Sequence, residues 1–508
     1  MQLPLLATLG RFEPVDYAVL AVYLAAMVLM GWYFSRREES TDDYFRGGRR
    51  VPWWAAGLSI FGTALSAITY VSIPGAAFSG DWVMVITHVS PILLVPLVAQ
   101  VYIPFYRRLD VTTPYEYLQK RFNTPVRLLA AAQWVVFQFG RMSIIMYLPS
   151  LALSAATGLN VYACILIMGL LTTLYTAMGG IEAVIWTDVV QVIVLMGGAV
   201  VSLFYVVAKV EGGFAGIISQ GAAAGKFHAF NWTWDYAVAA VWVMAIGGAV
   251  NNFSVYTTDQ SLVQRYMATP TLRQSKGALW TSALGGIPTG LLFFFLGTAL
   301  WAFYRQHADL LPAGTPPDSI FPLFIVQQLP PGVSGLLIAG IFAAAMSSID
   351  SGVNSVAAVI TTDFVRRFRP NAGEKRMLRL AQALTVAIGV VGTALALVLA
   401  TWNIKSQYVF FLTVLGLFTG GLAGLFVLGI FTRRATAWGS ILGAAASAGV
   451  MAVAQVRPGW VPVHGLLYGV LSLGVCVVVG YLASLALPGR PKSQAGLTIF
   501  TRSQTPDQ

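Results

Sequence analysis

Long apolar runs alternate with short polar segments along nearly the whole chain. A helix needs about 20 apolar residues to cross a bilayer, and runs of that length predict about thirteen membrane-spanning helices. Their expected limits are 14–35, 52–78, 82–106, 125–155, 160–178, 183–208, 237–262, 277–303, 333–365, 377–401, 408–431, 436–455 and 465–487. The pattern therefore indicates an all-α, polytopic membrane protein that forms one transmembrane domain over residues 1–508.

Two of the expected spans are interrupted by small and polar residues. The second contains SIFGTALSAITYVSIPG and the seventh contains AIGGAVNNFSVYTTDQ, five spans apart and in opposite membrane directions. Paired broken helices in two inverted halves are typical of secondary transporters, where the unwound backbone lines a cavity or binds an ion. Ordinary packing helices rich in Gly and Ser are the alternative that the spacing leaves open.

The ninth expected span carries a dense polar patch, FAAAMSSIDSGVNS, over residues 342–355. On a helix with about 100° per residue, its serines, Asp350 and Asn354 fall on one side, and Ser347 lies near mid-span. Hydroxyl and carboxylate oxygens suit a hard cation such as sodium, and a charge at the bilayer centre costs roughly 2.5–3.5 kcal/mol. The patch therefore indicates a cation site. The alternative is that the serines bond to their own helix and Asp350 is protonated or paired with an arginine.

Composition and charge agree with a membrane protein. The chain is 57% hydrophobic and 10% charged, whereas soluble proteins carry about 25% charged residues. The net charge of +11 comes from Lys and Arg clusters beside the spans. With the N-terminus outside, the inside segments hold 24 of the 31 Lys and Arg residues and the outside segments hold 6. The positive-inside rule then places the C-terminus, with a tail over 488–508, in the cytoplasm. Arg141 alone falls deep within a span, since Arg127 and Arg379 lie within three residues of the start of theirs.

Other functional classes lack sequence support. No motif for binding nucleic acid is present, and Cys164 and Cys476 lie in apolar runs that predict neither a disulfide framework nor a metal cluster. The histidines are scattered without an HExxH motif, and GAAAGKF is too short for a phosphate-binding loop. We therefore expect no enzyme, no catalytic residue and no ATP-driven pump. A channel is not expected, because no filter sequence repeats, and no obligate protein partner is evident.

Three passages are similar to the sodium/solute symporter family, which contains sodium-coupled glucose, proline, iodide and sialic acid transporters. They are YTAMGGIEAVIWTDVVQ (175–191), TTDQSLVQRY (257–266) and the polar patch of the ninth span. TDDYFRGGRRVPWWAAGLSIFGTALSAITYVSIP, FGRMSIIMYL and LLPAGTPPDSIFPLFIV resemble the bacterial sialic acid symporters of the family. The resemblance implies the leucine-transporter-like fold, with an extra helix over 14–35, inverted five-helix repeats over 52–208 and 237–431, and two extra helices over 436–487.

The resemblance also implies where sodium binds. In the family, carbonyls of the broken second span and hydroxyls of the ninth span form the principal sodium site. The matching positions here are Gly62, Leu65, Ala344, Ser347 and Ser348. A second sodium site, nearer the cytoplasm, would use Asp188, Ser347, Ser348, Asp350 and Ser351. Asp350 stands where the sialic acid relatives have serine, so the number of sodium ions stays open.

The implied substrate pocket consists of Ser66, Ala67, Thr69, Met84, His88 and Arg141. The planar guanidinium of Arg141 can hold a carboxylate through two parallel hydrogen bonds. Its alternative is a structural arginine paired with a helix end or an acid. Ala67, Met84 and His88 replace the serine, phenylalanine and glutamine of the relatives, and His88 alone is equally compatible with a packing role. Asp259 and Arg265 are candidates for an inner gate.

Together these features predict sodium-coupled uptake of a small organic solute across the cytoplasmic membrane by alternating access. Na+ is the expected coupling ion, and the partners are the solute, sodium and membrane lipid. Sialic acid or a related acidic sugar is the preferred substrate. A neutral sugar or a small monocarboxylate is the alternative.

Overall fold

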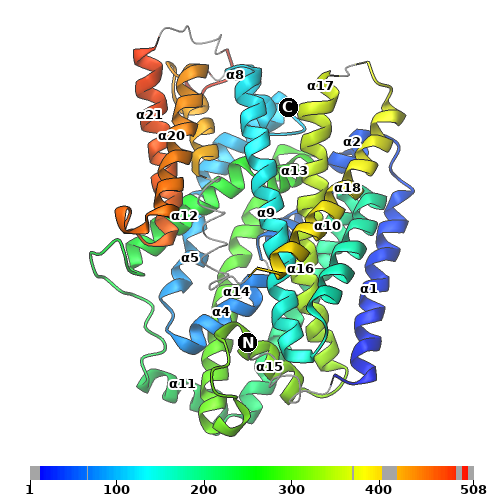
Figure 1. The fold of residues 1–508 in the computed structure, drawn as a ribbon, viewed down its shortest axis with the longest axis vertical. Helices are drawn as coiled ribbons and strands as arrows, with labels where there is room; N and C mark the ends of the chain where they lie inside the picture. Colours follow the sequence, from blue (N-terminus) through cyan, green and yellow to red (C-terminus); the bar gives the residue numbers. More distant parts are fainter. Residues whose placement is uncertain (1–11, 66, 369–370, 403–419, 488–494, 502–508) are drawn as a thin grey trace.

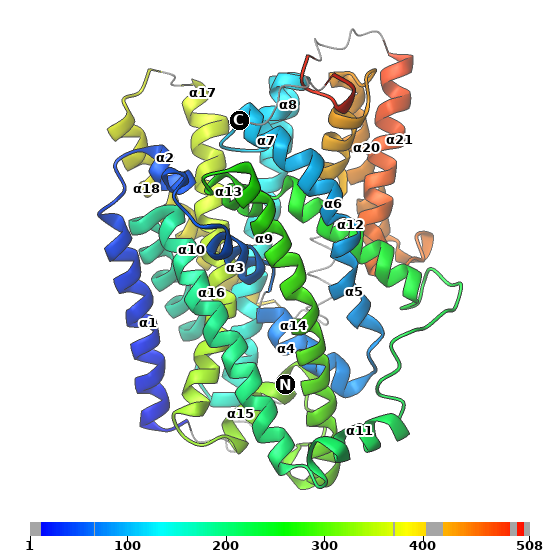
Figure 2. The ribbon, with the colours of Figure 1, turned by 180° about the vertical axis from the view of Figure 1, so that it is seen from behind.

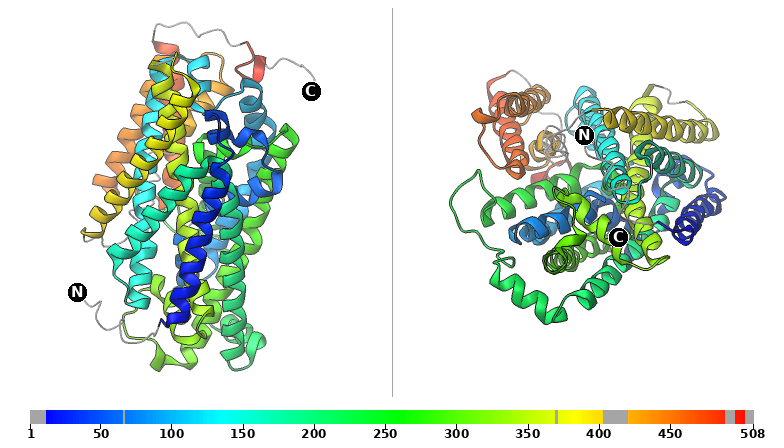
Figure 3. Two further views of the ribbon diagram at one scale, coloured as in Figure 1. Left: turned by 90° about the vertical axis from the view of Figure 1, so that its right-hand side faces the viewer. Right: turned by 60° about the horizontal axis from the view of Figure 1, so that its bottom comes forward.

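We describe the protein from a computed structural model, which covers residues 12–65, 67–368, 371–402, 420–487 and 495–501. All regular elements in these ranges are helices, and the long ones run roughly along one axis (Figure 1). Turned by 180°, the bundle shows α16 surrounded by its neighbours (Figure 2). In oblique view α20 and α21 lie at one edge and α1 at the opposite edge (Figure 3).

The α-helices follow one another along the chain with short 3-10 and π-helical segments between some of them. They are α1 (Pro14–Ser35), α2 (Thr41–Arg46), α3 (Trp53–Ala64), α4 (Ala67–Ser79), α5 (Ile86–Val89), α6 (Val95–Leu97), α7 (Ile103–Leu109), α8 (Tyr115–Arg121), α9 (Thr124–Thr157), α10 (Val161–Lys209), α11 (Gly213–Ala223), α12 (Val241–Thr258), α13 (Gln260–Met267), α14 (Leu272–Gln306), α15 (Pro317–Gln328), α16 (Val333–Val359), α17 (Arg366–Phe368), α18 (Glu374–Ala400), α20 (Ala437–Val456) and α21 (Tyr468–Ala486).

Within the described residues, nine helices are long and apolar enough to cross a membrane, or ten if the bent pair α3 and α4 is one span. Two expected spans, 160–178 and 183–208, lie together in the 49 residues of α10. A kink divides α10 at Gly180, whose φ of 53° favours glycine. The expected span 408–431 begins outside the described residues, and its described part is the helix Gly420–Phe431. The count of about thirteen spans stays a prediction.

The basic segments gather at one end of the bundle. Figure 1 shows α2, α8 and α17 at the top, whereas α11 and α15 lie at the bottom. α1 begins near the bottom and α21 ends near the top, so the described chain enters and leaves at opposite ends. An odd number of crossings, which the charge pattern predicted, agrees with this path.

α16 is the most buried long helix, with 89% of its most apolar window inside the protein. It packs against α10, α9, α1, α18 and α3. This position explains how so polar a helix exists in a membrane protein, because its oxygens face other helices rather than lipid. Asp350 is accordingly 0% exposed.

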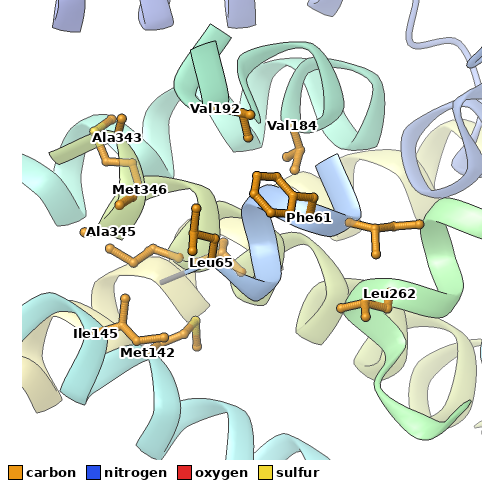
Figure 4. Packing of buried hydrophobic residues seen from close by; sticks show 14 of the residues in the cluster. Phe61, Leu65, Met142, Ile145, Val184, Val192, Leu262, Ala343, Ala345 and Met346 are labelled. Atoms are coloured by element: carbon orange, nitrogen blue, oxygen red, sulfur yellow. The ribbon is translucent and has the colours of Figure 1, made fainter. Parts of the chain in front are cut away.

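Apolar packing presses α3 against α10 beside α16. Figure 4 shows Phe61 of α3 beneath Val184 and Val192 of α10, and Leu65, which follows α3, on the side of Met346 of α16. A Cβ atom added to Gly62 would lie 2.8 Å from a methyl group of Val192, so the close approach requires glycine there. The end of α3 is thus held tightly beside the polar patch of α16.

Candidate functional site

The second expected span is broken. α3 ends at Ala64, and Leu65, a predicted sodium ligand, leaves the helical conformation with φ −85° and ψ 83°. The axes of Trp53–Ala64 and Thr69–Ser79 differ by 55°. The last carbonyls of a helix receive no hydrogen bond from that helix, so the break presents carbonyl oxygens of α3 to its neighbours. Ser66 lies outside the described residues.

The seventh expected span is also broken. α12 ends at Thr258 and α13 begins at Gln260, with Asp259 extended between them (φ −77°, ψ 115°). Gly247 and Gly248 lie inside continuous α12. α12 stays helical past these two glycines. The interruption therefore lies at the end of the polar stretch AIGGAVNNFSVYTTDQ and not at its glycines.

The structure brings four of the five predicted members of the principal sodium site, Gly62, Ala344, Ser347 and Ser348, close together. The Ser347 hydroxyl lies 3.1 Å from the Gly62 carbonyl oxygen and 3.2 Å from that of Ala344. The Ser348 hydroxyl donates to the Thr63 carbonyl at 3.3 Å. All of these residues are buried. Hydroxyl and carbonyl oxygens from α3 and α16 thus converge in a place that suits a small hard cation.

Two aspartates and an arginine form a second buried cluster next to this site. Asp188 accepts hydrogen bonds from Arg265, at 2.9 Å, and from the Ser59 hydroxyl through the same carboxylate oxygen. Its other oxygen, Oδ1, is buried without a hydrogen-bond partner. Asp350 accepts from the Tyr175 hydroxyl at 2.6 Å. Two ionised carboxylates beside one guanidinium would leave one negative charge for a cation to balance.

Ser351 connects the two oxygen clusters. Arg265 donates to its hydroxyl at 2.5 Å, and the Thr63 hydroxyl lies 2.9 Å from it. The backbone N–H of Ser351 donates to Asp350 Oδ1 at 2.5 Å. The predicted members of the second sodium site therefore lie close together, with Arg265 among them.

A cavity of about 520 Å³ opens beside the break between α3 and α4. Four of the predicted substrate residues, Thr69, Met84, His88 and Arg141, line it. Ser66 and the side chain of Ala67 lie outside the described part of the chain. A cavity of this size falls within the usual range of small-molecule sites, about 300–1,000 Å³.

Polar groups that we did not predict also line the cavity. They include the amides of Asn251 and Asn252 on α12 and the carboxyl group of Asp318 on α15. The Asp318 carboxyl group bonds to the hydroxyl of Ser72, and burial raises the pKa of Asp318 above its ordinary value. Amides, hydroxyls and a carboxyl group are the partners that a polyhydroxylated solute needs.

His88 both lines the cavity and packs against α14. A Cβ atom added to Gly290 would lie 2.9 Å from His88 Cβ, and the imidazole meets Phe294 edge to face with ring centroids 6.0 Å apart. The Thr87 hydroxyl lies 3.3 Å from its Nδ1. The packing role and the substrate role of His88 are therefore compatible.

Arg141 lines the cavity from α9 and touches both broken helices. Its Nη1 donates to Asp259 Oδ2 at 3.3 Å, and its Nη2 donates to the Thr63 carbonyl at 3.1 Å. The structural pairing that we considered as an alternative is thus present. These two bonds engage only part of the donor set of a guanidinium, so Arg141 also has the chemistry to receive an anion from the cavity.

Sequence reasoning missed several residues of the site. Arg265 belongs to the TTDQSLVQRY passage, but we predicted it only for a gate with Asp259. In the structure Arg265 pairs with Asp188, and Asp259 pairs with Arg141. Tyr175 opens the passage 175–191, and its contact with Asp350 spans 175 positions of the chain. Membership of these passages was the signal that could have identified both residues.

An all-helical bundle in which two broken helices enclose a buried oxygen cluster and a solute-sized cavity defines an ion-coupled secondary transporter. The sequence model of the Sodium:solute symporter family matches residues 44–446, and the chain belongs to this family. It is therefore a multi-pass membrane transporter and not an enzyme. The family expected from the sequence is confirmed.

Similar proteins match over nearly the full length. The chain is 40% identical to the sodium/sialic acid symporter SiaT of Proteus mirabilis over 96% of this chain and 98% of that protein. It is 38% identical to the sodium/sialic acid symporter NanT of Aliivibrio fischeri over 93% of both chains. The human sodium/iodide cotransporter is 30% identical over 84% of this chain and 67% of that protein.

Solved structures show the same fold. A Na+-coupled sialic acid symporter, solved in a substrate-bound outward-open state with a novel Na+ site, matches with a TM-score of 0.89 and 39% identity over 95% of this chain and 99% of that chain. Mhp1, a nucleobase-cation-symport-1 family transporter, matches in a closed conformation with a TM-score of 0.58 and 14% identity over 87% of this chain and 94% of that chain. The second likeness concerns the fold alone.

Proposed function

We propose that the protein takes up sialic acid or a related acidic sugar together with sodium across the cytoplasmic membrane. The observation that carries this proposal is Arg141, a buried guanidinium on the wall of the cavity of about 520 Å³. It lies 3.1 Å from the Thr63 carbonyl, which also accepts a hydrogen bond from Ser348 of the predicted sodium site. The two bacterial relatives that are 38–40% identical over nearly the whole chain are sodium/sialic acid symporters.

The architecture that we propose has the N-terminus outside, the C-terminus inside and inverted five-helix repeats over 52–208 and 237–431. The two helix breaks support it, since one lies in each proposed repeat, after α3 and after α12. Breaks at corresponding positions of two repeats place unwound backbone around one central site.

Sodium would bind first between α3 and α16. It would replace the long hydrogen bonds of Ser347 and Ser348 with direct contacts to hydroxyl and carbonyl oxygens. Such contacts require α3 and α16 to stand as close as they do here. The ion therefore favours the conformation that joins these helices, and only this difference in affinity between conformations lets sodium drive transport.

Charge balance supports a second sodium ion. The residues around the two breaks are three aspartates and two arginines, Asp188, Asp259, Asp350, Arg141 and Arg265. With all five groups ionised, the cluster would carry one net negative charge, and a substrate carboxylate would add another. Two sodium ions would neutralise the loaded site, and one positive charge would enter per cycle. Each 100 mV of membrane potential contributes about 2.3 kcal/mol per charge moved.

The remaining cavity groups would select the sugar. Asp318 and Asn252 face the same cavity as Arg141 and offer hydrogen-bond partners to hydroxyl groups. Met84 and His88 stand where the sialic acid relatives have phenylalanine and glutamine. We therefore propose that the carboxylate clamp is shared with these relatives and that preference among acidic sugars differs.

Hydrogen bonds join the break of the seventh span to the chain around the start of α8. The Tyr115 hydroxyl donates to the Thr258 carbonyl at 3.0 Å, and the Gln260 amide donates to the Thr112 carbonyl at 3.0 Å. These bonds hold the break of the seventh span against the first residue of α8 and the segment that precedes it. In alternating access, release of the solute to the cytoplasm requires them to separate.

Reconstitution in proteoliposomes tests the proposed function. A panel of sialic acid, glucose, galactose, proline, acetate and pantothenate is offered with sodium, lithium, potassium or choline outside. We expect uptake of sialic acid against its gradient in sodium, with an inward current that corresponds to one charge per molecule. Full uptake in choline, or preference for a neutral solute, would refute the proposal.

A further inference from the structure

The single intramembrane arginine of α9 ties the two broken helices to each other. Arg141 bonds to the last turn of α3 through the Thr63 carbonyl and to the break of the seventh span through Asp259. It is 9% exposed and faces the cavity. Both partners belong to segments that must change their separation during alternating access.

Asp259 has two distinct roles in this arrangement. Its Oδ1 accepts from the backbone N–H of Ser261 at 2.8 Å and so caps α13. Its Oδ2 meets Arg141 Nη1 at 3.3 Å. The side chain is buried. The distance to Arg141 is long for a charge-assisted bond, which is ordinarily about 2.7–2.9 Å, so this contact is the weaker of the two.

We propose that Asp259 binds Arg141 in place of the substrate carboxylate while the cavity is empty. When an acidic solute binds, its carboxylate displaces Asp259 from Arg141. This inference rests on the proposed function, since it needs an acidic substrate. Two carboxylates and one guanidinium in a poorly solvated site cannot all pair well, because like charges placed side by side repel strongly. Arrival of the substrate carboxylate therefore favours separation of Asp259 from Arg141.

The structure offers Asp259 a stable position after this exchange. Its Oδ1 keeps the bond to the Ser261 N–H, where a carboxylate at a helix N-terminus is favourable. A void of about 10 Å³ lies beside it, lined by Ser254 and Thr258 among others. This volume is at the lower limit for one water molecule, which would hydrate the freed Oδ2.

The exchange gives substrate binding a mechanical consequence. Loss of the pair releases the break after α12 from the α9 arginine, while Arg141 stays attached to α3 through Thr63. A neutral solute has no carboxylate to displace Asp259 and would leave the tie in place. Asp259 would thus make the movement of the bundle depend on an acidic substrate.

The variant Asp259→Asn tests the exchange, because asparagine caps a helix as well as aspartate does but carries no competing charge. Binding of sialic acid and of its neutral methyl ester is measured by calorimetry in saturating sodium. We expect the acid to bind at least about tenfold more tightly than to the unchanged protein, equivalent to 1.4 kcal/mol, with little change for the ester. Equal or weaker binding of the acid would overturn the inference.

Two comparisons separate the exchange from other effects. Asp363→Asn breaks another buried Arg–Asp pair, with Arg127 at 2.6 Å, that lies outside the cavity lining, and it should not tighten binding. In a structure with sialic acid and sodium bound, Asp259 Oδ2 should lie beyond hydrogen-bond distance of Arg141. Persistence of that bond beside the bound carboxylate would overturn the inference.

The outcomes distinguish this inference from the proposed function. If the unchanged protein binds no carboxylate of the panel, both fail. If it binds the acid and Asp259→Asn does not improve binding, the exchange alone fails. Asp259→Ser, which keeps a capping oxygen, serves if the asparagine variant does not fold. Misfolding of both, with Asp363→Asn folded, would make Asp259 structural and overturn the exchange.

Discussion

Replacement of Arg141 by lysine is the sharpest test of the carboxylate clamp. Lysine keeps the positive charge but loses the planar fork that can meet a carboxylate through two parallel bonds. In the structure the guanidinium already bonds to Asp259 at 3.3 Å and to the Thr63 carbonyl at 3.1 Å. The single ammonium group of a lysine can donate either to those partners or to the substrate. It cannot hold a carboxylate through two parallel hydrogen bonds.

The expected loss follows from one missing charge-assisted hydrogen bond. Such a bond is worth about 1.5–3 kcal/mol, and each 1.4 kcal/mol corresponds to about tenfold in affinity. Arg141→Lys should therefore weaken an acidic substrate about 10- to 100-fold. A neutral ester loses at most an uncharged bond of about 0.5–1.5 kcal/mol, which is roughly 2- to 10-fold.

The assay compares sodium-dependent uptake of radiolabelled sialic acid and its methyl ester in proteoliposomes. Arg121→Lys is the matched control, because this buried arginine donates to the carbonyls of Gly429 and Thr432 and does not line the cavity. Equal loss for acid and ester in Arg141→Lys would refute the clamp and make Arg141 a structural arginine.

Three further changes test other parts of the site. Ser348→Ala removes a proposed ligand and should raise the sodium concentration for half-maximal uptake by about tenfold, the effect of about 1.4 kcal/mol; an unchanged sodium curve would reject this ligand. Asp350→Ser removes one of the two carboxylates of the second cluster and should lower the charge moved per substrate in current recordings. Unchanged currents and an unchanged sodium dependence would show that Asp350 takes no part in ion coupling. Glu38, between α1 and α2, has both carboxyl oxygens buried without a partner, and burial, with Asp43 and Glu182 nearby, raises its pKa from 4.5 to about 9. Folding therefore loses stability as the pH rises from 4.5 towards 9; Glu38→Gln should flatten that part of a thermal-stability profile, and a profile parallel to that of the unchanged protein would contradict the assignment.

Much of the helix layout could be predicted because a bilayer imposes strict lengths on apolar segments. The ninth span was expected at 333–365, and the structure has a continuous helical segment over Val333–Val365. The break of the second span was also predicted from the small and polar residues at its centre. Such residues favour an unwound backbone, which is tolerated in a membrane only where it lines a cavity or is buried in protein. The sequence predicted two spans, 160–178 and 183–208, with a short connection between them. The structure has one helical segment that is kinked in this place, at Gly180, where an added Cβ atom would lie 2.6 Å from the carbonyl oxygen of Tyr44 in α2.

Within the site, the sequence by itself determined which chemical groups lie in the spans: the hydroxyls and Asp350 of the ninth, the flexible backbone of the second and the isolated arginine of the fourth. These groups were recognisable because charge and polarity are rare and costly in a bilayer. Only the tertiary structure decided the pairs. Arg141 meets Asp259 across 118 positions, and Arg265 meets Asp188 across 77. Periodicity along one helix carries no information about such distances, since they depend on how separate helices pack.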